Sequence, residues 1–337
     1  MIPEYKYQAH DHSLLTPIFK KQVVDRVMRK FPVSIPANLI TICSNLFIYF
    51  ALILAFFYRD YHPLKFLVIA ICAFIYLLGD HMDGAQAKRT GTSSPLGEFF
   101  DHYLDIFNNG IFIYILYLLF NVSSVYILAV YLLFSYLAHT VLLYEQYQSK
   151  WLNFERIGTF EGVVLAILFM LAGSVPAIFN VLIHPYFSGF SLFTCIFLLS
   201  LIGALITFFK TLIRAKIKNY KIYLFFILLI LVSFTTVKFY HSYIVFAIIV
   251  IYSSLFIGDI QRAHLCGGRL ELPDILFPVF TFFIIIILIM IDIPFQFFDF
   301  FEIYFIILFM YLIICALSLF ISTVYQLRQF WYWKNPE

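Results

Sequence analysis

Four aspartates stand at helical spacings between two apolar stretches of the sequence. Asp80 and Asp83 are three residues apart, and Asp101 and Asp105 are four apart, so on a helix the members of each pair project from one face. Two such faces set against each other would form a cage of carboxylates. Because Mg²⁺ prefers oxygen ligands and usually shares a few carboxylates with substrate phosphates and water, the spacing favours a divalent-cation site for a diphosphate substrate over a solvated turn.

The segment between the two pairs contains several small residues and two positively charged ones. Gly84, Ala87 and Gly97 leave room for a backbone or a ligand to approach closely. Lys88 and Arg89 directly follow Ala87 and are able to bind phosphate. Paired carboxylates on both sides of such a segment indicate a site that holds metal ions against a phosphorylated ligand.

Residues 80–105 resemble the signature of the CDP-alcohol phosphotransferase family. That signature is Asp, two residues, Asp-Gly, two residues, Ala-Arg, eight residues, Gly, three residues, Asp, three residues, Asp. The matching positions are Asp80, Asp83, Gly84, Ala87, Gly97, Asp101 and Asp105. The family's arginine is Lys88 here, and Arg89 follows it. Because lysine lacks the planar guanidinium that binds phosphate with two hydrogen bonds, both side chains are candidates to bind the diphosphate.

Two further patches resemble the choline/ethanolamine phosphotransferase branch of this family. One is the wider segment around the motif, with its QAKRT, SSPLGE and FDHYLD stretches, and the other is the Asn-Leu-Ile-Thr run at residues 38–41. A weaker likeness lies at residues 144–155 and 160–162. The resemblance therefore covers about the first half of the chain at the level of motifs.

The resemblance implies that a lipid hydroxyl attacks the β-phosphate of a CDP-alcohol and that CMP leaves. It implies two Mg²⁺ ions, with Mn²⁺ as the alternative, held chiefly by Asp80, Asp83 and Asp101. By the same likeness Asp105 is the general base and an additional metal contact. The residues expected to bind the nucleotide substrate are Asn38, Gly84, Ala87, Lys88, Arg89 and Gly97.

Two histidines compete with Asp105 for the role of base, since imidazole titrates near neutral pH. His102 follows Asp101 directly, so on a helix it points about 100° away from that ligand. His139 lies within an apolar stretch, where an ionisable side chain is often functional. A hydrogen bond between helices is the simpler explanation for His139.

The helices that must position these residues are membrane-spanning. Of the 337 residues, 63% are hydrophobic and only 12% are charged, and the mean hydropathy is +0.93, whereas about a quarter of the residues of a soluble domain are charged. The fold class predicted is therefore all-α, a polytopic helical membrane protein. Runs near 20 residues suffice to cross a bilayer. We predict about ten spans, at 38–57, 62–80, 105–120, 124–145, 160–179, 187–209, 221–237, 241–258, 274–291 and 301–322.

The distribution of lysine and arginine predicts the orientation of these spans, because cytoplasmic loops carry the positive charges. With ten spans, 19 of the lysines and arginines fall on one side, and only Arg59, Lys65 and Lys238 fall on the other. This split places both termini and the aspartates in the cytoplasm. The membrane would be a bacterial inner membrane or that of the endoplasmic reticulum or Golgi.

The chain divides into one membrane domain and two cytoplasmic ends. Residues 1–37 form an N-terminal segment, 38–322 the transmembrane phosphotransferase domain and 323–337 a C-terminal tail. Within the first segment, residues 14–31 carry apolar side chains near helical spacing with lysines and arginines between them, which is typical of an amphipathic helix lying on the membrane surface.

The function predicted is transfer of phosphoethanolamine or phosphocholine from a CDP-alcohol to diacylglycerol. An alternative within the family uses CDP-diacylglycerol and a soluble alcohol, but the resemblance implies smaller chains for that branch, and ten predicted spans favour the first. A transporter is the alternative of another class, although transporters tend to place charge at the membrane midplane. Nucleic acid is excluded as a partner, because no stripe of cations with interleaved aromatics occurs. The remaining partners expected are membrane lipids and, from the resemblance, a second copy of the chain.

The alcohol head group is predicted only as a class. A quaternary ammonium would favour a cage of aromatic rings with a nearby acid, and choline and ethanolamine both stay open. The candidates for such a cage are Tyr103, Tyr144, Glu145, Tyr147, Trp151 and Glu161.

Overall fold

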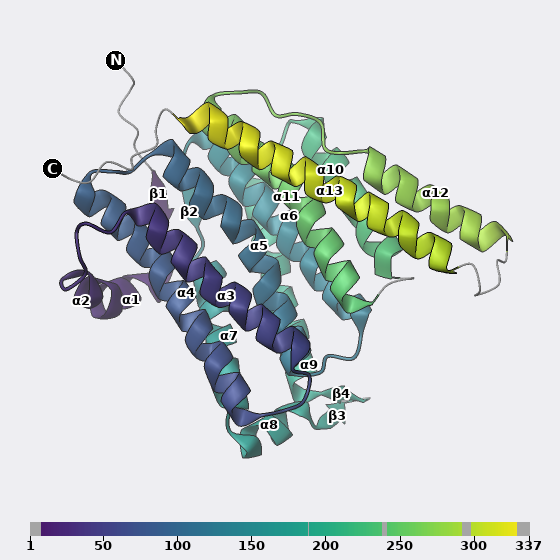
Figure 1. Cartoon of the computed structure of the whole chain (residues 1–337), viewed down its shortest axis with the longest axis horizontal. Helices are drawn as coiled ribbons and strands as arrows, with labels where there is room; N and C mark the ends of the chain where they lie inside the picture. The colour runs from purple at the N-terminus through teal and green to yellow at the C-terminus, as the bar shows by residue number, and fades with distance from the viewer. Residues whose placement is uncertain (1–7, 188, 238–240, 292–297, 329–337) are drawn as a thin grey trace.

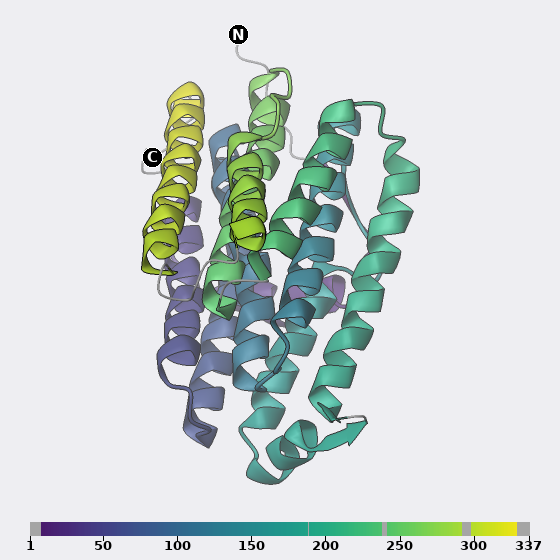
Figure 2. The same ribbon diagram turned by 90° about the vertical axis from the view of Figure 1, so that its right-hand side faces the viewer.

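The computed structural model describes residues 8–187, 189–237, 241–291 and 298–328, and these form a bundle of long helices (Figure 1). Residues 1–7 of the predicted N-terminal segment and 329–337 of the predicted tail lie outside the described residues. Figure 2 shows the helices running side by side along one direction. In chain order the long helices are α3 (Ala37–Phe57), α4 (Pro63–Thr90), α5 (Pro95–Leu119), α6 (Val125–Ser149), α7 (Thr159–Gly173), α8 (Pro176–Ile183), α9 (Leu192–Ala215), α10 (Tyr220–Val237), α11 (Ser242–Cys266), α12 (Leu276–Ile291) and α13 (Phe298–Leu327).

The predicted class, an all-α multi-pass membrane protein, is confirmed. Among the described residues, seven helices are long and apolar enough to cross a bilayer, and an eighth is counted if α7 and α8 form one broken span. The α5 helix is not one of the seven, and it carries the polar Asp101, Asp105 and Asn108. The described part of α12 has only 16 residues. Each predicted span meets a helix, but the number ten stays a prediction.

The fifth predicted span, 160–179, is wrong as a continuous helix. Helix α7 ends at Gly173, and α8 begins at Pro176 with its axis bent by 113°. Proline lacks the backbone N–H that a continuing helix needs, and its ring clashes with the preceding turn, so it is tolerated at the first position of a new helix instead. The break therefore follows from Pro176.

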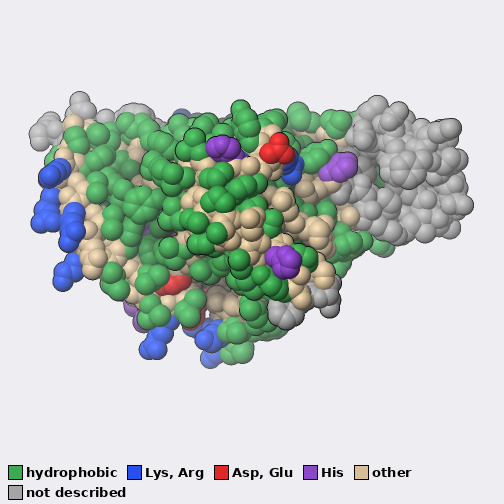
Figure 3. Space-filling view, turned by 90° about the horizontal axis from the view of Figure 1, so that it is seen from below, with side chains coloured by type: hydrophobic (Ala, Val, Ile, Leu, Met, Phe, Trp, Pro, Cys, Tyr) green, Lys and Arg blue, Asp and Glu red, His purple; other side chains and the backbone are tan. Residues whose placement is uncertain are grey.

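The outer surface suits a lipid environment. Figure 3 shows a face dominated by hydrophobic side chains, with most of the visible lysines and arginines toward the left, the end where Figure 1 places α1 and α2. Large apolar side chains are exposed on several helices, among them Ile213 on α9 and Ile321 on α13. Exposed apolar surface of this extent marks a membrane-embedded face, and the orientation of the termini stays a prediction.

The predicted N-terminal helix is present as a continuous run of α1 (Thr16–Phe19), the π-helix η1 (Lys20–Val24) and α2 (Asp25–Met28). Its buried side chains Val24 and Met28 pack on Ile40 of α3 and Met82 of α4. Leu14 and Ile18 remain mostly exposed. Part of the apolar face that was expected to meet lipid is therefore buried against the protein, close to the cytoplasmic end predicted for α4.

A short strap ties the N-terminus to the start of α7. Strand β1 (Ala9–Asp11) pairs in parallel with β2 (Leu152–Phe154), and the Glu161 carboxylate accepts hydrogen bonds from the Ser13 hydroxyl at 2.5 Å and from the Leu14 N–H at 3.0 Å. A second small pair, β3 (Pro185–Phe187) with β4 (Phe190–Ser191), is antiparallel and joins α8 to α9. The strap holds the N-terminal helix in place over α4.

Helices α3 and α4 are in tight contact at Gly79. A Cβ built there would lie 2.3 Å from Ser44 Cβ, well inside van der Waals contact, and Ser44 Cβ can move only with its own backbone. This close contact brings the N-terminal turns of α3 beside the part of α4 that carries Asp80 and Asp83.

We expect Gly79→Ala to destabilise the protein by about 1–3 kcal/mol, the usual cost of overpacking a tight contact. The measurement is the apparent unfolding temperature in detergent. Gly203→Ala on α9 is the matched control, because no atom lies within 4 Å of a Cβ built at that position. Equal unfolding temperatures for the two variants would show that α3 and α4 do not meet at Gly79.

Candidate metal and substrate site

The turn between α4 and α5 sets the two halves of the aspartate motif against each other. Helix α4 ends at Gly91, whose φ of 66° lies in the left-handed region that glycine adopts without strain. Helix α5 begins after Ser94, whose hydroxyl accepts a hydrogen bond from the Gly97 N–H at 3.1 Å. The chain therefore reverses direction, and the last turns of α4 face the first turns of α5.

Three of the four aspartates converge across this reversal. One carboxylate oxygen from each of Asp80, Asp101 and Asp105 lies within 4.8 Å of the other two. The three side chains are neither fully buried nor fully exposed. Three like charges at this separation repel one another unless a cation or protons neutralise them, and three carboxylate oxygens are the donor set that Mg²⁺ or Mn²⁺ prefers.

Asp83 is buried and turned toward α3. Its carboxylate accepts hydrogen bonds from the Thr41 hydroxyl at 2.5 Å and from the Gly84 N–H at 2.5 Å. Thr41 is the last residue of the Asn-Leu-Ile-Thr run noted in the sequence, and this contact gives that run a structural role. In the described chain, the group of three converging carboxylates does not include Asp83, although Asp83 lies less than one turn after Asp80 on α4.

A hydrogen-bonded network holds Asp105 in position. Its Oδ1 accepts from the Tyr76 hydroxyl at 2.8 Å, and Asn108 Nδ2 donates to that hydroxyl at 3.1 Å and to Asn45 Oδ1 at 2.8 Å. Sequence analysis missed Tyr76, Asn45 and Asn108. The available signal was that each is a polar side chain inside an apolar stretch, with Tyr76 four residues before Asp80 and Asn108 three after Asp105.

The predicted nucleotide-binding residues lie around the same turn. A Cβ built at Gly97 would lie 3.4 Å from Asn38 Oδ1, so Asn38 of α3 sits directly against the start of α5. Gly84 is exposed, with no atom within 4 Å of a Cβ built there. Ala87 is partly buried and Lys88 is exposed. Asn38 and Gly97 are thus in contact, and Gly84 leaves open space beside them.

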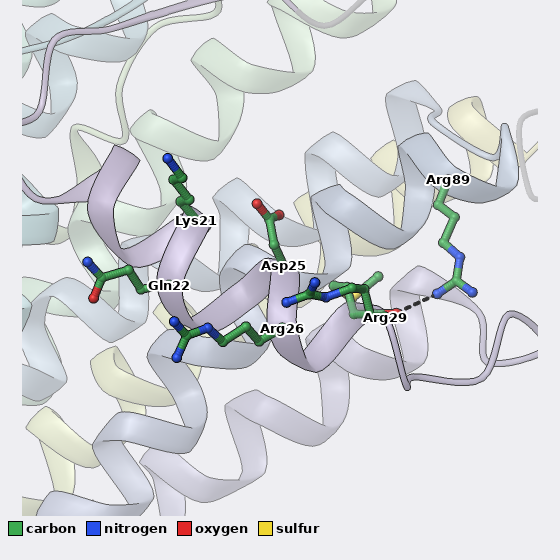
Figure 4. A pocket seen from close by; sticks show the side chains of 7 residues that line it. Lys21, Gln22, Asp25, Arg26, Arg29 and Arg89 are labelled. Carbon is green, nitrogen blue, oxygen red and sulfur yellow. Dashed lines mark hydrogen bonds between the residues drawn. The ribbon is translucent and has the colours of Figure 1, made fainter.

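Arg89 is engaged by the N-terminal helix. Its guanidinium donates to the Met28 carbonyl at 2.8 Å and to the Phe31 carbonyl at 3.0 Å. Figure 4 shows it at one end of an open surface cavity of about 930 Å³. The cavity is lined by Lys21, Gln22, Asp25, Arg26, Met28, Arg29 and Arg89. Of the two cations that the motif offers, Arg89 therefore helps to end α2, whereas Lys88 is exposed.

A second polar cluster adjoins the metal group one turn earlier on α5. The Glu98 Oε1 atom accepts from Gln146 Nε2 of α6 at 2.8 Å. The same oxygen lies 3.9 Å from His102 Nδ1 and 3.9 Å from His264 Nε2 of α11. Glu98 lies in the SSPLGE stretch of the motif region, but its partners Gln146 and His264 are more than 45 and 160 positions away along the chain and were not predicted.

The candidates for an aromatic cage have other partners. Glu161 holds the N-terminal strap, and Glu145 is paired with Arg214 of α9 at 2.5 and 2.8 Å. Trp151 stacks on His10 with a centroid separation of 4.3 Å. Tyr103 stacks on Phe99. These contacts use four of the six candidates for packing and tethering, and the aromatic cage stays a prediction.

Comparisons with known proteins agree with the motif. Residues 34–196 match the family model described as CDP-alcohol phosphatidyltransferase. The chain is 32% identical over 197 residues to an uncharacterized CDP-alcohol phosphatidyltransferase class-I family protein of Schizosaccharomyces pombe, covering 54% of this chain and 49% of that protein. It is 37% identical over 106 residues to choline/ethanolaminephosphotransferase 1 of Arabidopsis thaliana, covering 30% and 27%. With ethanolaminephosphotransferase 1 of Homo sapiens it shares 28% over 246 residues, covering 65% and 61%.

The matched region coincides with the site. The chain spans about half the length of the first of these relatives and 27% to 61% of the other two. All four aspartates, the α4–α5 turn and Asn38 fall within residues 34–196, whereas α10 to α13 and the N-terminal helix fall outside it. The motif carboxylates that converge on α4 and α5 therefore lie in the part of the chain, residues 34–196, that matches the CDP-alcohol phosphatidyltransferase family model.

Proposed function

We propose that this protein transfers phosphoethanolamine or phosphocholine from a CDP-alcohol to diacylglycerol, releasing CMP and forming phosphatidylethanolamine or phosphatidylcholine. The observation that carries the proposal is the set of three carboxylate oxygens within 4.8 Å of one another on α4 and α5. The names of the A. thaliana and H. sapiens relatives support it, since both are aminoalcohol phosphotransferases.

The donor set fits a divalent cation. We assign Asp80, Asp101 and Asp105 as ligands of Mg²⁺, with Mn²⁺ as the alternative, and Asp83 as a further ligand if two ions bind. Bound metal would neutralise the diphosphate and polarise its phosphorus–oxygen bonds. The Thr41 and Gly84 hydrogen bonds hold Asp83, and the Tyr76 hydroxyl holds Asp105, so the protein positions the carboxylates before substrate arrives.

The reaction needs one proton acceptor. The oxygen of the lipid hydroxyl forms a bond to the β-phosphorus, the bond from that phosphorus to the bridging oxygen breaks, and CMP leaves with the bridging oxygen. The hydroxyl proton passes to a base of the protein. Catalysis of this kind depends chiefly on position and charge, so the groups that align the hydroxyl with the β-phosphate contribute most.

We propose a change in the preferred base. Asp105 was predicted for this role, but it lies among the three converging carboxylates, and a carboxylate oxygen that coordinates a cation is a weak proton acceptor. His102 directly follows Asp101 in the chain. Its side chain is nearly buried, and its Nδ1 atom lies 3.9 Å from Glu98 Oε1. We therefore assign Asp105 chiefly as a metal ligand and His102 as the base, and retain Asp105 as the alternative base.

The nucleotide would lie along the end of α4. Gly84 leaves open space there, Ala87 lies one turn further on, and Asn38 and Gly97 meet at the side. Lys88 is exposed and takes the place of the family's arginine, so we assign it to the diphosphate. Arg89 is assigned a smaller part in substrate binding than predicted, because its guanidinium already donates to two carbonyls of the N-terminal helix.

We propose the orientation, the membrane and the partners that the sequence predicts. Both termini and the carboxylates would face the cytoplasm of a bacterial cell or of a cell with an endoplasmic reticulum and Golgi. The lipid acceptor would reach the site from the bilayer and the CDP-alcohol from the cytoplasm. A homodimer stays a prediction.

The decisive assay measures CMP release by the purified protein in detergent and lipid. We expect release from CDP-ethanolamine or CDP-choline only when diacylglycerol and Mg²⁺ or Mn²⁺ are both present, with formation of the matching phospholipid. Release that requires CDP-diacylglycerol and a soluble alcohol instead would favour the alternative branch. Absence of CMP release from every such pair would overturn the proposal and leave a transporter as the remaining class.

A further inference from the structure

Helix α11 carries two incompletely bonded polar side chains, Gln261 and His264, and His264 reaches the Glu98 side of α5. Gln261 is only 3% exposed, and within the described part of the chain neither its Oε1 nor its Nε2 atom has a hydrogen-bond partner. The Nδ1 atom of His264 is buried and likewise unpartnered there. The other ring nitrogen of His264 lies 3.9 Å from Glu98 Oε1. Both residues lie outside the region that matches the family.

Buried polar atoms that lack hydrogen-bond partners need an explanation. The great majority of buried polar groups in proteins have a hydrogen-bond partner, because desolvation without one is costly. An apolar side chain of the same size would pack at position 261 without that cost. A glutamine with two unpaired atoms, one turn of helix from an unpaired imidazole nitrogen, therefore indicates that a bound molecule completes these hydrogen bonds.

The two atoms of the Gln261 amide restrict what that molecule is. The N–H donors need an acceptor, and the carbonyl oxygen needs a donor. An ammonium head group has only donors, so it leaves the Gln261 N–H unpaired. A hydroxyl group beside an ester carbonyl supplies a donor and an acceptor together, which is the polar end of a diacylglycerol.

The surroundings of this cluster also suit a lipid. Phe99 and Tyr103 of α5 and Phe320 of α13 pack together, with centroid separations of 5.2 Å between the first two and 5.6 Å from Tyr103 to Phe320. The outer face of α13 is strongly apolar, and Ile314 and Ile321 on it are more than 60% exposed. The Tyr103 ring lies against α11 at Gly258, one turn before Gln261, and the outer side of α13 is apolar, as a helix facing the bilayer requires.

We propose that Gln261 and His264 of α11 bind the hydroxyl and ester groups of the neutral lipid acceptor next to Glu98. The inference rests on the proposed function and adds to it the residues that hold the acceptor. Glu98 is three residues from Asp101 on α5, so an acceptor held there has its hydroxyl beside the metal-binding turn. Gln261 and His264 act as binding residues and exchange no proton or phosphoryl group.

The first test is Gln261→Leu, assayed with dioctanoylglycerol and CDP-ethanolamine as separately varied substrates. We expect the KM for dioctanoylglycerol to rise about 5- to 10-fold, as the loss of one or two neutral hydrogen bonds implies, while the KM for CDP-ethanolamine changes less than about twofold. The apparent unfolding temperature without substrate should rise, because an unpaired buried amide is removed. A residue with a purely structural role would raise stability and leave both KM values unchanged.

Ser253→Ala is the matched control. Ser253 lies on the same helix, is fully buried and also has an unpartnered hydroxyl within the described chain, but it is two turns from Gln261. Its replacement should leave both KM values at those of the wild type. If Gln261→Leu fails to fold, His264→Asn replaces it, with the same expected rise in the acceptor KM alone.

A binding measurement separates this inference from the proposed function. Dioctanoylglycerol alone, without nucleotide, should raise the unfolding temperature of the wild type and of Ser253→Ala, and this shift should shrink or vanish in Gln261→Leu or His264→Asn. A wild type that never releases CMP contradicts the proposed function. An active wild type whose acceptor KM and lipid-induced shift survive both α11 substitutions contradicts the inference. A rise in the KM for CDP-ethanolamine instead would place the nucleotide, not the acceptor, against α11.

Discussion

Replacing Asp101 by asparagine should lower the rate of CMP release by about 1,000-fold or more at saturating CDP-ethanolamine, diacylglycerol and Mg²⁺. A metal ion contributes several kcal/mol of charge stabilisation to phosphoryl transfer. Asparagine keeps the size of the side chain but removes the negative charge from a group of three oxygens that lie within 4.8 Å of one another. The remaining two carboxylates would bind the cation weakly. The measurement is steady-state CMP release as a function of Mg²⁺ concentration.

Asp60→Asn is the matched control for this loss. Asp60 lies in the exposed connection between α3 and α4, away from the carboxylate group, so its replacement should leave the rate and the Mg²⁺ dependence unchanged. The effect of Mg²⁺ on unfolding temperature provides a readout without turnover. This effect should be lost in Asp101→Asn and retained in Asp60→Asn. An Asp101→Asn protein that kept the wild-type Mg²⁺ midpoint would remove this aspartate from the metal site.

The pair Asp105→Asn and His102→Asn should separate the metal ligand from the base. We expect Asp105→Asn to abolish turnover and to weaken the Mg²⁺-induced rise in unfolding temperature, because Asp105 belongs to the converging group. We expect His102→Asn to lower the rate by about 100- to 10,000-fold, the usual effect of losing a general base, with the Mg²⁺ effect on stability retained. Binding of CDP-ethanolamine, measured by calorimetry with Mg²⁺, should change little in His102→Asn.

The opposite results for His102→Asn and Asp105→Asn would reverse the assignment of the base. If His102→Asn retained more than a tenth of the wild-type rate while Asp105→Asn lost turnover with an unchanged response to Mg²⁺, Asp105 would be the base as the sequence predicts. His139→Asn on α6 provides a third comparison, since the simpler explanation of that side chain is a contact between helices. Its replacement is expected to affect stability more than the rate.

Much of the site could be predicted because helical spacing is a local property. Asp80 with Asp83 and Asp101 with Asp105 project from shared faces whatever surrounds the helices. Gly91 and Ser94, between the pairs, are residue types that end one helix and begin the next. The spans were predictable for a similar reason, because the length of an apolar run and the bilayer thickness decide them together. The exception at residues 174–175 came from overlooking Pro176, itself a local signal.

Local sequence patterns do not predict which distant residues each of these side chains contacts. The turn of Asp83 toward Thr41, the support of Asp105 by Tyr76 and the use of Arg89 by the carbonyls of Met28 and Phe31 join residues about 30 to 60 positions apart. The spacing predicts that four aspartates are available as metal ligands. It does not predict which three of them converge.

The sequence by itself determined the membrane-spanning helices, the phosphotransferase motif and the residue types that could hold a divalent cation, because composition and helical periodicity act over a few turns. Only the tertiary structure decided that Asp80, Asp101 and Asp105 meet, and that His264 of α11 reaches the Glu98 side of α5. Those contacts depend on how helices distant in the chain pack, and packing is settled by side-chain shape, as at Gly79 against Ser44, rather than by any repeat along the sequence.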